Sequence, residues 1–252
     1  MSPTSYQAAL PRDELVSIYL GLQGVNVLKI GGVFLIEYKF NQHGGEIMKK
    51  FVLFLVVMGL STAAFAATTE GMKGLLPPGS KAPDFKLADV SSGTEFSPKD
   101  FEGKKALVVT FICRHCPYVQ HIKKALAALG NDYKDKDVAI VAISSNDAKA
   151  FPDDAPESLK EMAIEEGFAF PFLYDETQKV AKAYTAVATP DVFVFDKDQK
   201  LVYRGQFDNT RPNSGKEATG ADVRAALDAL LAGQPVSKEQ KPAIGCGIKW
   251  KK

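Results

Sequence analysis

The sequence contains few of the residues on which several protein classes depend. Among its 252 residues are three cysteines, three histidines and one tryptophan. So few cysteines exclude a scaffold built on many disulfides, and so few cysteines and histidines limit the possibilities for a closed metal site. The formal net charge is only +1, without an excess of one sign. That balance argues against nucleic acid or an acidic membrane surface as a partner.

The chain also lacks an apolar run long enough to cross a bilayer, which needs about 20 residues. The run at residues 51–60 is short, follows Lys49 and Lys50, and precedes small residues around Ala66. This order is typical of a secretory signal peptide. We therefore predict a signal peptide at residues 48–66 with cleavage after Ala66, and a periplasmic or secreted product without stable membrane insertion.

The predicted signal begins far inside the chain, whereas export signals act at an N-terminus. The segment Gly44-Gly45-Glu46-Ile47 can be encoded by a purine-rich stretch that resembles a bacterial ribosome-binding site. We interpret residues 1–47 as unstructured upstream translation from a misplaced start codon, with a genuine extension as the alternative. Residues 67–79 are predicted to be a flexible leader, and residues 80–252 to be one domain.

The most informative motif is Cys113-Arg114-His115-Cys116. The apolar run 106–112 before it suits a strand that is buried on both faces, and the residues after it recur at helical spacing. Two thiols at such a junction can form a redox couple, and a helix N-terminus favours the thiolate. We expect Cys113, at the exposed end of the helix, to attack and Cys116 to resolve the mixed disulfide.

Periodicity and turn residues predict further elements along the chain. A hairpin is expected from residues 84–87 and 94–97, and a buried strand at 138–144. Helices are expected to end near Gly130 and Gly167, and another to span 177–184. Strands at 191–195 and 201–204 are expected to form a second hairpin, followed by a helix at 221–231. Together these elements predict an α/β fold, a mixed sheet with helices on both faces.

Two other interpretations of paired cysteines are weaker. Haem attachment requires a histidine directly after the second cysteine, where this chain has Pro117. A zinc site needs two more ligands, and only His115, His121 and Cys246 are available after the signal. Because His115 lies between the two cysteines, an ordinary closed site is disfavoured. We therefore predict redox chemistry without a metal or another cofactor.

The two residues inside the motif are predicted to support catalysis. Positive charge on Arg114 and His115 would stabilise the thiolate of Cys113, and with it the reduced form. This predicts a more oxidising potential than that of a typical thioredoxin. An alternative for His115 is a solvated loop position.

Several segments together resemble a known family. The motif with its strand, the segment Ala188-Thr189-Pro190-Asp191, and the glycines and Trp250 around Cys246 are similar to thioredoxin-like proteins of the alkyl hydroperoxide reductase/thiol-specific antioxidant family. The resemblance runs from about residue 76 to the C-terminus. It implies a thioredoxin-like fold with an N-terminal hairpin and an inserted strand–helix unit at 138–167. It also implies a cis Thr189–Pro190 bond beside the dithiol, with Thr189 and Pro190 binding the substrate chain.

The same resemblance raises peroxide chemistry as an alternative. Peroxidases of this family carry a threonine or serine three residues before the reactive cysteine, and Thr110 satisfies this. They also carry a proline seven residues before it, where this chain has Ala106. Arg204 could serve as the activating arginine or simply form a salt bridge.

Cys246 lies between Gly245 and Gly247, which allow close backbone approach. It is either a third redox residue or a small apolar side chain. The sequence thus predicts an exported thiol-disulfide oxidoreductase acting on protein or small-molecule thiols and disulfides. The alternatives are a thiol peroxidase acting on hydroperoxides and a non-enzymatic module that binds a metal or a partner.

Overall fold

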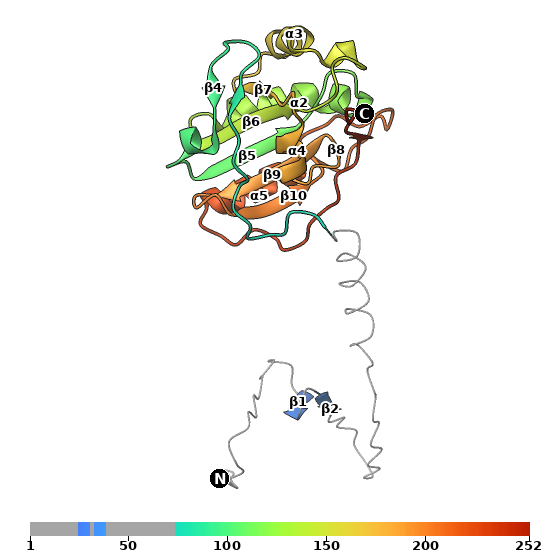
Figure 1. Cartoon of the computed structure of the whole chain (residues 1–252). Coiled ribbons are helices and arrows are strands. Elements are labelled where there is room, and N and C mark those ends of the chain that lie inside the picture. Colours follow the sequence, from blue (N-terminus) through green and yellow to red (C-terminus); the bar gives the residue numbers. More distant parts are fainter. Residues whose placement is uncertain (1–24, 31–32, 39–73) are drawn as a thin grey trace, which may run out of the picture. The chain divides into compact units, whose positions relative to one another are not determined.

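The computed structural model describes residues 25–30, 33–38 and 74–252 of the chain (Figure 1). The chain forms two compact units, Met1–Val56 and Val57–Lys252. The predicted signal peptide at 48–66 lies outside the described residues. Within the described part of the chain, no helix combines the length and the apolarity needed to cross a membrane.

The first unit contains an antiparallel hairpin of β1 (Val25–Ile30) and β2 (Val33–Tyr38), with Ile30 opposite Val33. Two β-branched, apolar runs separated by a Gly-Gly pair are a hairpin signal that the prediction of an unstructured segment overlooked. That prediction is corrected for these two strands. The misplaced start codon stays a prediction.

The core of the second unit is a five-stranded mixed sheet in the order β10-β9-β5-β6-β7. Its strands are β5 (Ala106–Phe111), β6 (Val138–Ser144), β7 (Phe172–Tyr174), β9 (Asp191–Asp196) and β10 (Leu201–Gly205). Every residue of β5 and β6 is buried, as expected for strands covered on both faces. β5 pairs parallel with β6 and antiparallel with β9, so the mixed sheet is confirmed.

Helices cover both faces of this sheet (Figure 1). The helices α2 (Pro117–Tyr133), α3 (Pro156–Glu166) and α5 (Ala221–Leu231) pack on one face, against side chains such as Val108 and Ile140. The short helix α4 (Lys179–Ala183) and the 3-10 turn η1 (Pro98–Phe101) pack on the other. Alternate residues of β5 enter the two clusters, because successive strand side chains point to opposite faces. The predicted α/β class is confirmed.

Smaller elements complete the unit. The predicted N-terminal hairpin is present in shorter form as β3 (Leu87–Ala88) and β4 (Glu95–Phe96). The strand and helix predicted within 138–167 are β6 and α3, with the 3-10 turn η2 (Pro152–Asp154) between them, and β6 lies between β5 and β7 in the sheet. Two short strands near the dithiol, β8 (Ala188–Thr189) and β11 (Cys246–Gly247), pair with each other.

Two predicted boundaries are corrected. Helix α2 continues past Gly130 to Tyr133, and a Cβ atom at Gly130 would lie 2.7 Å from the ring of Phe170. That glycine therefore allows close packing inside the helix and does not end it. The flexible leader does not extend to residue 79, because the N–H of Leu76 donates to Thr185 and that of Gly79 to the carbonyl of Leu201.

Candidate functional site

The two cysteines of the motif lie where the sequence places them, at the junction of a central strand and a helix. β5 ends at Phe111, and α2 begins at Pro117 with Cys116 as its N-cap. The helix N-terminus therefore directs its free N–H groups to Cys116. Both side chains are 0% exposed, so the predicted exposed position of Cys113 is wrong in this closed arrangement. The reason is the loop around Thr189, which packs directly on the pair.

The Thr189–Pro190 peptide bond is cis, as predicted. The Cys113 Sγ lies 3.3 Å from the Thr189 hydroxyl, and the Cys116 Sγ lies 3.1 Å from the Thr189 carbonyl oxygen. One residue thus offers a hydroxyl to the first sulfur and an acceptor to the second. The predicted approach of this loop to the dithiol is confirmed.

The C-terminal strand β11 lies on the same loop. Cys246 is opposite Thr189 in the antiparallel pair, and it packs against the buried cluster that contains Cys113 and Cys116. Cys246 therefore lies close to the dithiol, and its role as a third redox residue stays a prediction. The edge of Thr189 that was predicted to receive a substrate strand faces β11 in this structure.

Asp154 is a site residue that the sequence analysis missed. It is fully buried, and its Oδ1 accepts hydrogen bonds from the backbone N–H groups of Arg114 and His115, at 2.7 and 3.2 Å. Its Oδ2 accepts from the side chains of Asn146 at 2.8 Å and His115 at 2.6 Å. A lone aspartate in a turn-rich segment carries no local signal for this role, since the partner loop lies about 40 residues away in the chain.

Arg114 does not direct its charge at the dithiol. Its guanidinium donates to the Ser158 carbonyl and the Glu161 carboxylate, both at 2.7 Å, and lies 3.5 Å from Glu165. These acidic residues lie on one face of α3, and they compensate the positive charge. The prediction that Arg114 stabilises the Cys113 thiolate is therefore corrected.

His115 lies between aromatic and acidic partners. Its ring stacks on Phe151 with centroids 5.2 Å apart. Because the Asp154 carboxylate only accepts hydrogen bonds, the Nδ1 of His115 is the donor in their contact. The alternative of a solvated loop position is wrong, since the side chain is held on two sides.

The two thiols compete for one proton. Hydrogen bonds from the Cys113 and Cys246 thiols and from the Val119 N–H lower the pKa of Cys116 to about 4, although burial acts against this. The pKa of Cys113 is raised, first by its hydrogen bond to Cys116, then by burial and by the charge of Asp154. In the closed, reduced site the pair therefore holds a single negative charge, and the Cys116 thiol can also donate to the Thr189 carbonyl oxygen when that charge lies on Cys113. Cys116 is the N-cap of α2, so the helix N-terminus acts on it directly, and the Cys113 thiolate stays a prediction.

Arg204 and Thr110, the residues considered for peroxide chemistry, have other surroundings in the structure. Arg204 is 4% exposed; its guanidinium donates to Thr185 and to Asp191, and it lies over the ring of Phe193. This is the salt bridge that the sequence left open as an alternative. The Thr110 hydroxyl is buried without a hydrogen-bond partner in the described part of the chain. Among the described residues, neither Arg204 nor Thr110 forms a hydrogen bond with a cysteine sulfur.

One group of described side chains could hold a metal ion. Ligand atoms of Cys113, His115 and Asp154 lie within 4.8 Å of one another. Each oxygen of Asp154 already accepts two hydrogen bonds, however, and a metal would compete with His115 for Oδ2. The hydrogen bonds of Asp154 therefore suit a role in fixing the loop 113–116 better than a role in metal binding.

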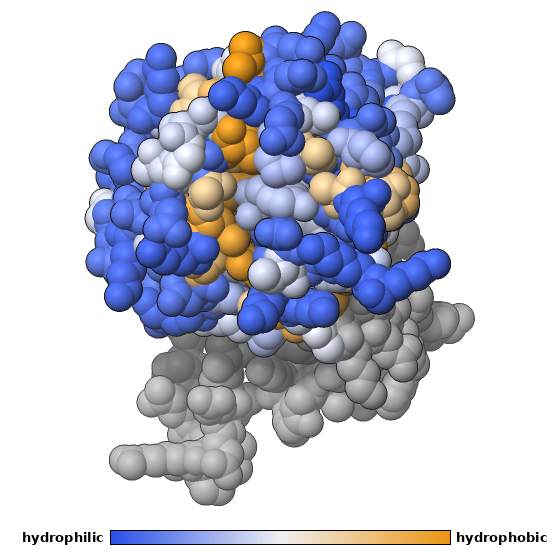
Figure 2. Space-filling view, turned by 45° about the horizontal axis from the view of Figure 1, so that its top comes forward, coloured by the Kyte–Doolittle hydropathy of each residue, from blue (hydrophilic) through white to orange (hydrophobic). Residues whose placement is uncertain are grey.

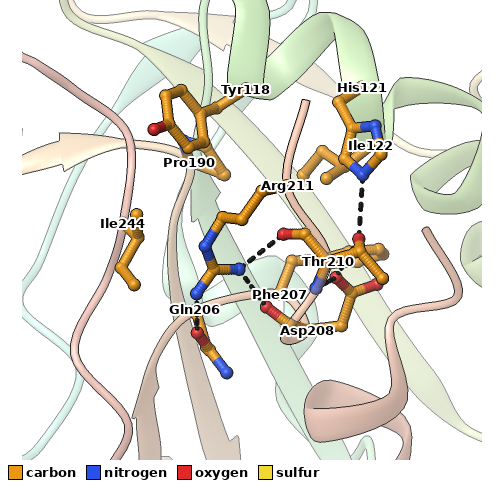
Figure 3. Close-up of a pocket in the computed structure, with 10 residues that line it drawn as sticks. All are labelled: Tyr118, His121, Ile122, Pro190, Gln206, Phe207, Asp208, Thr210, Arg211 and Ile244. Carbon is orange, nitrogen blue, oxygen red and sulfur yellow. Dashed lines mark hydrogen bonds between the residues drawn. The ribbon is translucent and has the colours of Figure 1, made fainter. Parts of the chain in front are cut away.

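A small pocket lies beside the cis proline (Figure 3). Tyr118 and Ile244 border it near Pro190, and the Arg211 guanidinium, which also lines it, donates to the Gln206 side-chain oxygen. The half-buried His121 also lines the pocket, and its Nε2 lies 2.8 Å from the Thr210 hydroxyl. The surface in Figure 2 is mostly hydrophilic, with a narrow apolar band.

This combination of sheet order, cis proline and paired cysteines is the thioredoxin-like arrangement. Residues 78–204 match the AhpC/TSA family, and the chain belongs to that family. The resemblance inferred from the sequence is confirmed.

Individual proteins agree with this placement. The crystal structure of an uncharacterized conserved protein from Geobacillus kaustophilus is 53% identical, with a TM-score of 0.69 over 71% of this chain and 94% of that one. A hypothetical protein from Sinorhizobium meliloti is 47% identical, with a TM-score of 0.68 over 70% of this chain and 96% of that one. The thiol-disulfide oxidoreductase ResA of Bacillus thuringiensis is 26% identical over 133 residues, which are 53% of this chain and 72% of ResA.

Proposed function

We propose that the protein is an exported thiol-disulfide oxidoreductase whose working couple is Cys113 and Cys116. The observation that carries this proposal is the contact of both sulfurs with Thr189 while they share one proton. A buried zinc or haem site does not require such sharing, whereas disulfide exchange begins from a thiolate.

Thr189 supports the transfer of that proton. When Cys113 passes its proton to Cys116, the Cys116 thiol donates to the Thr189 carbonyl oxygen, 3.1 Å away. The Cys113 thiolate in turn accepts a hydrogen bond from the Thr189 hydroxyl, 3.3 Å away. Both products of the transfer therefore have a partner in place, and Cys113 becomes the nucleophile.

The exchange then follows in two steps. Cys113 Sγ bonds to one sulfur of the partner disulfide, and the partner's S–S bond breaks with its electron pair on the second sulfur, which takes up a proton. Cys116, once deprotonated, attacks Cys113 Sγ, and the first partner sulfur leaves as a thiol. The partner is reduced by two electrons, and the protein holds a Cys113–Cys116 disulfide. The reverse sequence oxidises a partner dithiol.

The surface beside Pro190 is proposed to receive the partner chain. The pocket offers the aromatic ring of Tyr118 and the side chain of Ile244, which is 40% exposed. Val187, in the same loop as the cis proline, is 49% exposed. These apolar side chains suit a protein thiol or disulfide flanked by apolar residues.

Reduction of insulin disulfides by dithiothreitol, catalysed by the purified protein, tests the activity. Cys113→Ser should abolish catalysis, and Cys116→Ser should accumulate a mixed disulfide with the substrate. Wild-type turnover by Cys113→Ser would overturn the proposal. Peroxide consumption that is lost in Cys113→Ser and kept in Cys116→Ser would instead indicate the peroxidase alternative.

The reduction potential is proposed to be more oxidising than the thioredoxin value of about −270 mV. The reason differs from the sequence-based one, since Arg114 is paired with acidic residues. A low pKa at Cys116 stabilises the reduced form and thereby raises the potential. Equilibration with thioredoxin of known potential measures the value, and a potential at or below that of thioredoxin would contradict it.

Export rests on residues 48–66 of the sequence. Cleavage after Ala66 would release a protein beginning at Ala67, in the periplasm or outside the cell. Mass spectrometry of the N-terminus of the protein recovered from those fractions tests this. Recovery of a peptide from residues 1–40 would overturn both the cleavage and the misplaced start.

A further inference from the structure

The three cysteines differ in their access to solvent. Cys113 and Cys116 are 0% exposed, whereas Cys246 is partly exposed. The couple proposed above is therefore sealed in this arrangement, and the thiol that solvent reaches lies on the C-terminal strand. A dissolved thiol or disulfide meets this cysteine first.

The backbone of this segment is built for close approach to the dithiol. A Cβ atom at Gly245 would lie 2.1 Å from the carbonyl oxygen of Thr189, so only glycine fits there. The next residue, Cys246, is opposite Thr189 in the register of β8 and β11. Close contact at Gly245 thus places the Cys246 thiol over the residue that contacts both other sulfurs.

Cys116 has a thiol neighbour on each side. Cys113 precedes it in the motif, and Cys246 packs against the buried cluster that contains both cysteines, opposite the Thr189 whose carbonyl oxygen accepts from Cys116 Sγ at 3.1 Å. A disulfide bond is about 2.05 Å long, so either neighbour must move towards Cys116 to form one. The site therefore permits two alternative disulfides that share one sulfur.

We propose, building on the dithiol function above, that Cys246 is a third redox residue that takes over the disulfide from the buried pair. In the oxidised protein, the Cys246 thiolate attacks Cys116 Sγ. The Cys116–Cys246 bond forms, the Cys113–Cys116 bond breaks, and the electron pair stays on Cys113, which takes the proton released by Cys246. The exchange needs no outside oxidant, because the number of disulfides is unchanged.

The transfer moves the disulfide to where a reductant can reach it. A thiolate from solution attacks the partly exposed Cys246 Sγ, and Cys116 departs with the electron pair. Thiols whose thiolate is stabilised are good leaving groups, and the Val119 N–H at the start of α2 stabilises that of Cys116. Cys113 is free during this stage and can meet a further partner.

Peptide mapping of the full-length protein distinguishes the two disulfides. Trypsin cleaves after Arg114, between the first two cysteines, and yields peptides 106–114, 115–123 and 239–249 with one cysteine each. The reduced protein is oxidised with increasing amounts of oxidised glutathione, its free thiols are blocked with N-ethylmaleimide, and linked peptides are quantified. We expect 115–123 linked to 239–249 in addition to 106–114 linked to 115–123. If 106–114 linked to 115–123 is the only disulfide found, and Cys246 is fully alkylated at every step, the proposal is overturned.

Matched variants isolate the new bond. In Cys113→Ser, oxidation should link Cys116 to Cys246, whereas in Cys116→Ser no Cys113–Cys246 disulfide is expected. Thermal unfolding of each variant establishes that it is folded. A folded Cys113→Ser protein in which Cys246 stays alkylatable, or forms only bonds between chains, contradicts the inference.

A kinetic measurement separates this inference from the proposed function. Reduction of the oxidised protein by glutathione should slow severalfold in Cys246→Ser, and Cys246→Ala should behave alike. If Cys113 and Cys116 cycle normally and both variants are reduced at the wild-type rate, the role of Cys246 fails while the proposed function stands. If the pair does not cycle in the wild type, the proposed function itself fails.

Discussion

Two loops meet at the dithiol, and each is held by one fully buried aspartate. Asp154 holds the loop 113–116, and Asp191 holds the loop that contains the cis proline. Asp154 accepts four hydrogen bonds from N–H groups of Arg114, His115 and Asn146, without a lysine or arginine side chain among these donors. Asp191 accepts one from the Val187 N–H and pairs with the Arg204 guanidinium at 3.0 Å.

The difference determines what each carboxylate does to the cysteines. The charge of Asp191 is compensated by Arg204, so this pair fixes a loop. Among the described residues, Asp154 has no guanidinium or ammonium partner, and its charge acts on Cys113 and raises the pKa of that thiol. One aspartate is therefore structural, whereas the other also influences which sulfur carries the proton.

The largest expected effect on stability comes from breaking the ion pair between Asp191 and Arg204. Arg204→Met removes the cation and leaves the carboxylate buried and unpaired, which should lower the free energy of unfolding by about 3–5 kcal/mol. Denaturant unfolding measures this loss. The double variant Arg204→Met/Asp191→Asn should recover part of the stability, and additive losses from the two single changes would contradict a coupled pair.

Asp154→Asn should have a smaller effect on stability and a larger one on chemistry. The new amide group would face the donors of Asn146 and His115, at a cost of about 1–3 kcal/mol. Loss of the negative charge should lower the pKa of Cys113. The pH dependence of Cys113 alkylation in a Cys116→Ser background, with and without Asp154→Asn, measures the shift. An unchanged pH profile would show that Asp154 only holds the loop.

The proton shared by the cysteines predicts a pH dependence. The pKa of Cys116 is lowered to about 4, well below the ordinary thiol value of about 8.5. A depressed pKa contributes stability that is full above the ordinary value and is lost as pH falls towards the folded-state value. Reduced wild type should therefore lose stability between about pH 8.5 and pH 4 relative to Cys116→Ser. Ultraviolet thiolate absorbance should persist to about pH 4, and its loss near the ordinary thiol pKa would contradict this charge distribution.

Arg114→Gln should have the smallest effect and serves as the control for Asp154→Asn. The guanidinium is already paired with Glu161 and Glu165, which are 65% and 56% exposed. Loss of such a surface pair should cost about 1 kcal/mol or less. The reduction potential should stay within a few millivolts of wild type. A clear fall in the potential would restore the original role of Arg114 as a stabiliser of the thiolate.

Local sequence patterns were sufficient for a strand that is almost entirely apolar and for a helix with one apolar face. The prediction of strand 138–144 and that of helix 221–231 agree with β6 and α5 residue for residue. The end of α2 was predicted too early because a glycine can either end a helix or allow close packing inside one. Only the position of Phe170, forty residues later, shows which of the two applies.

The sequence by itself determined the class of chemistry, because two thiols at a strand-to-helix junction and a Thr-Pro bond before a later strand are local patterns. Tertiary structure alone decided the charge distribution around them. Arg114 adjoins Cys113 in the chain, yet it pairs with glutamates on α3. Asp154 and Cys246 are distant in sequence, yet they lie beside the sulfurs. Electrostatic and hydrogen-bond effects on a thiol depend on distance in space, which a linear order of residues does not specify.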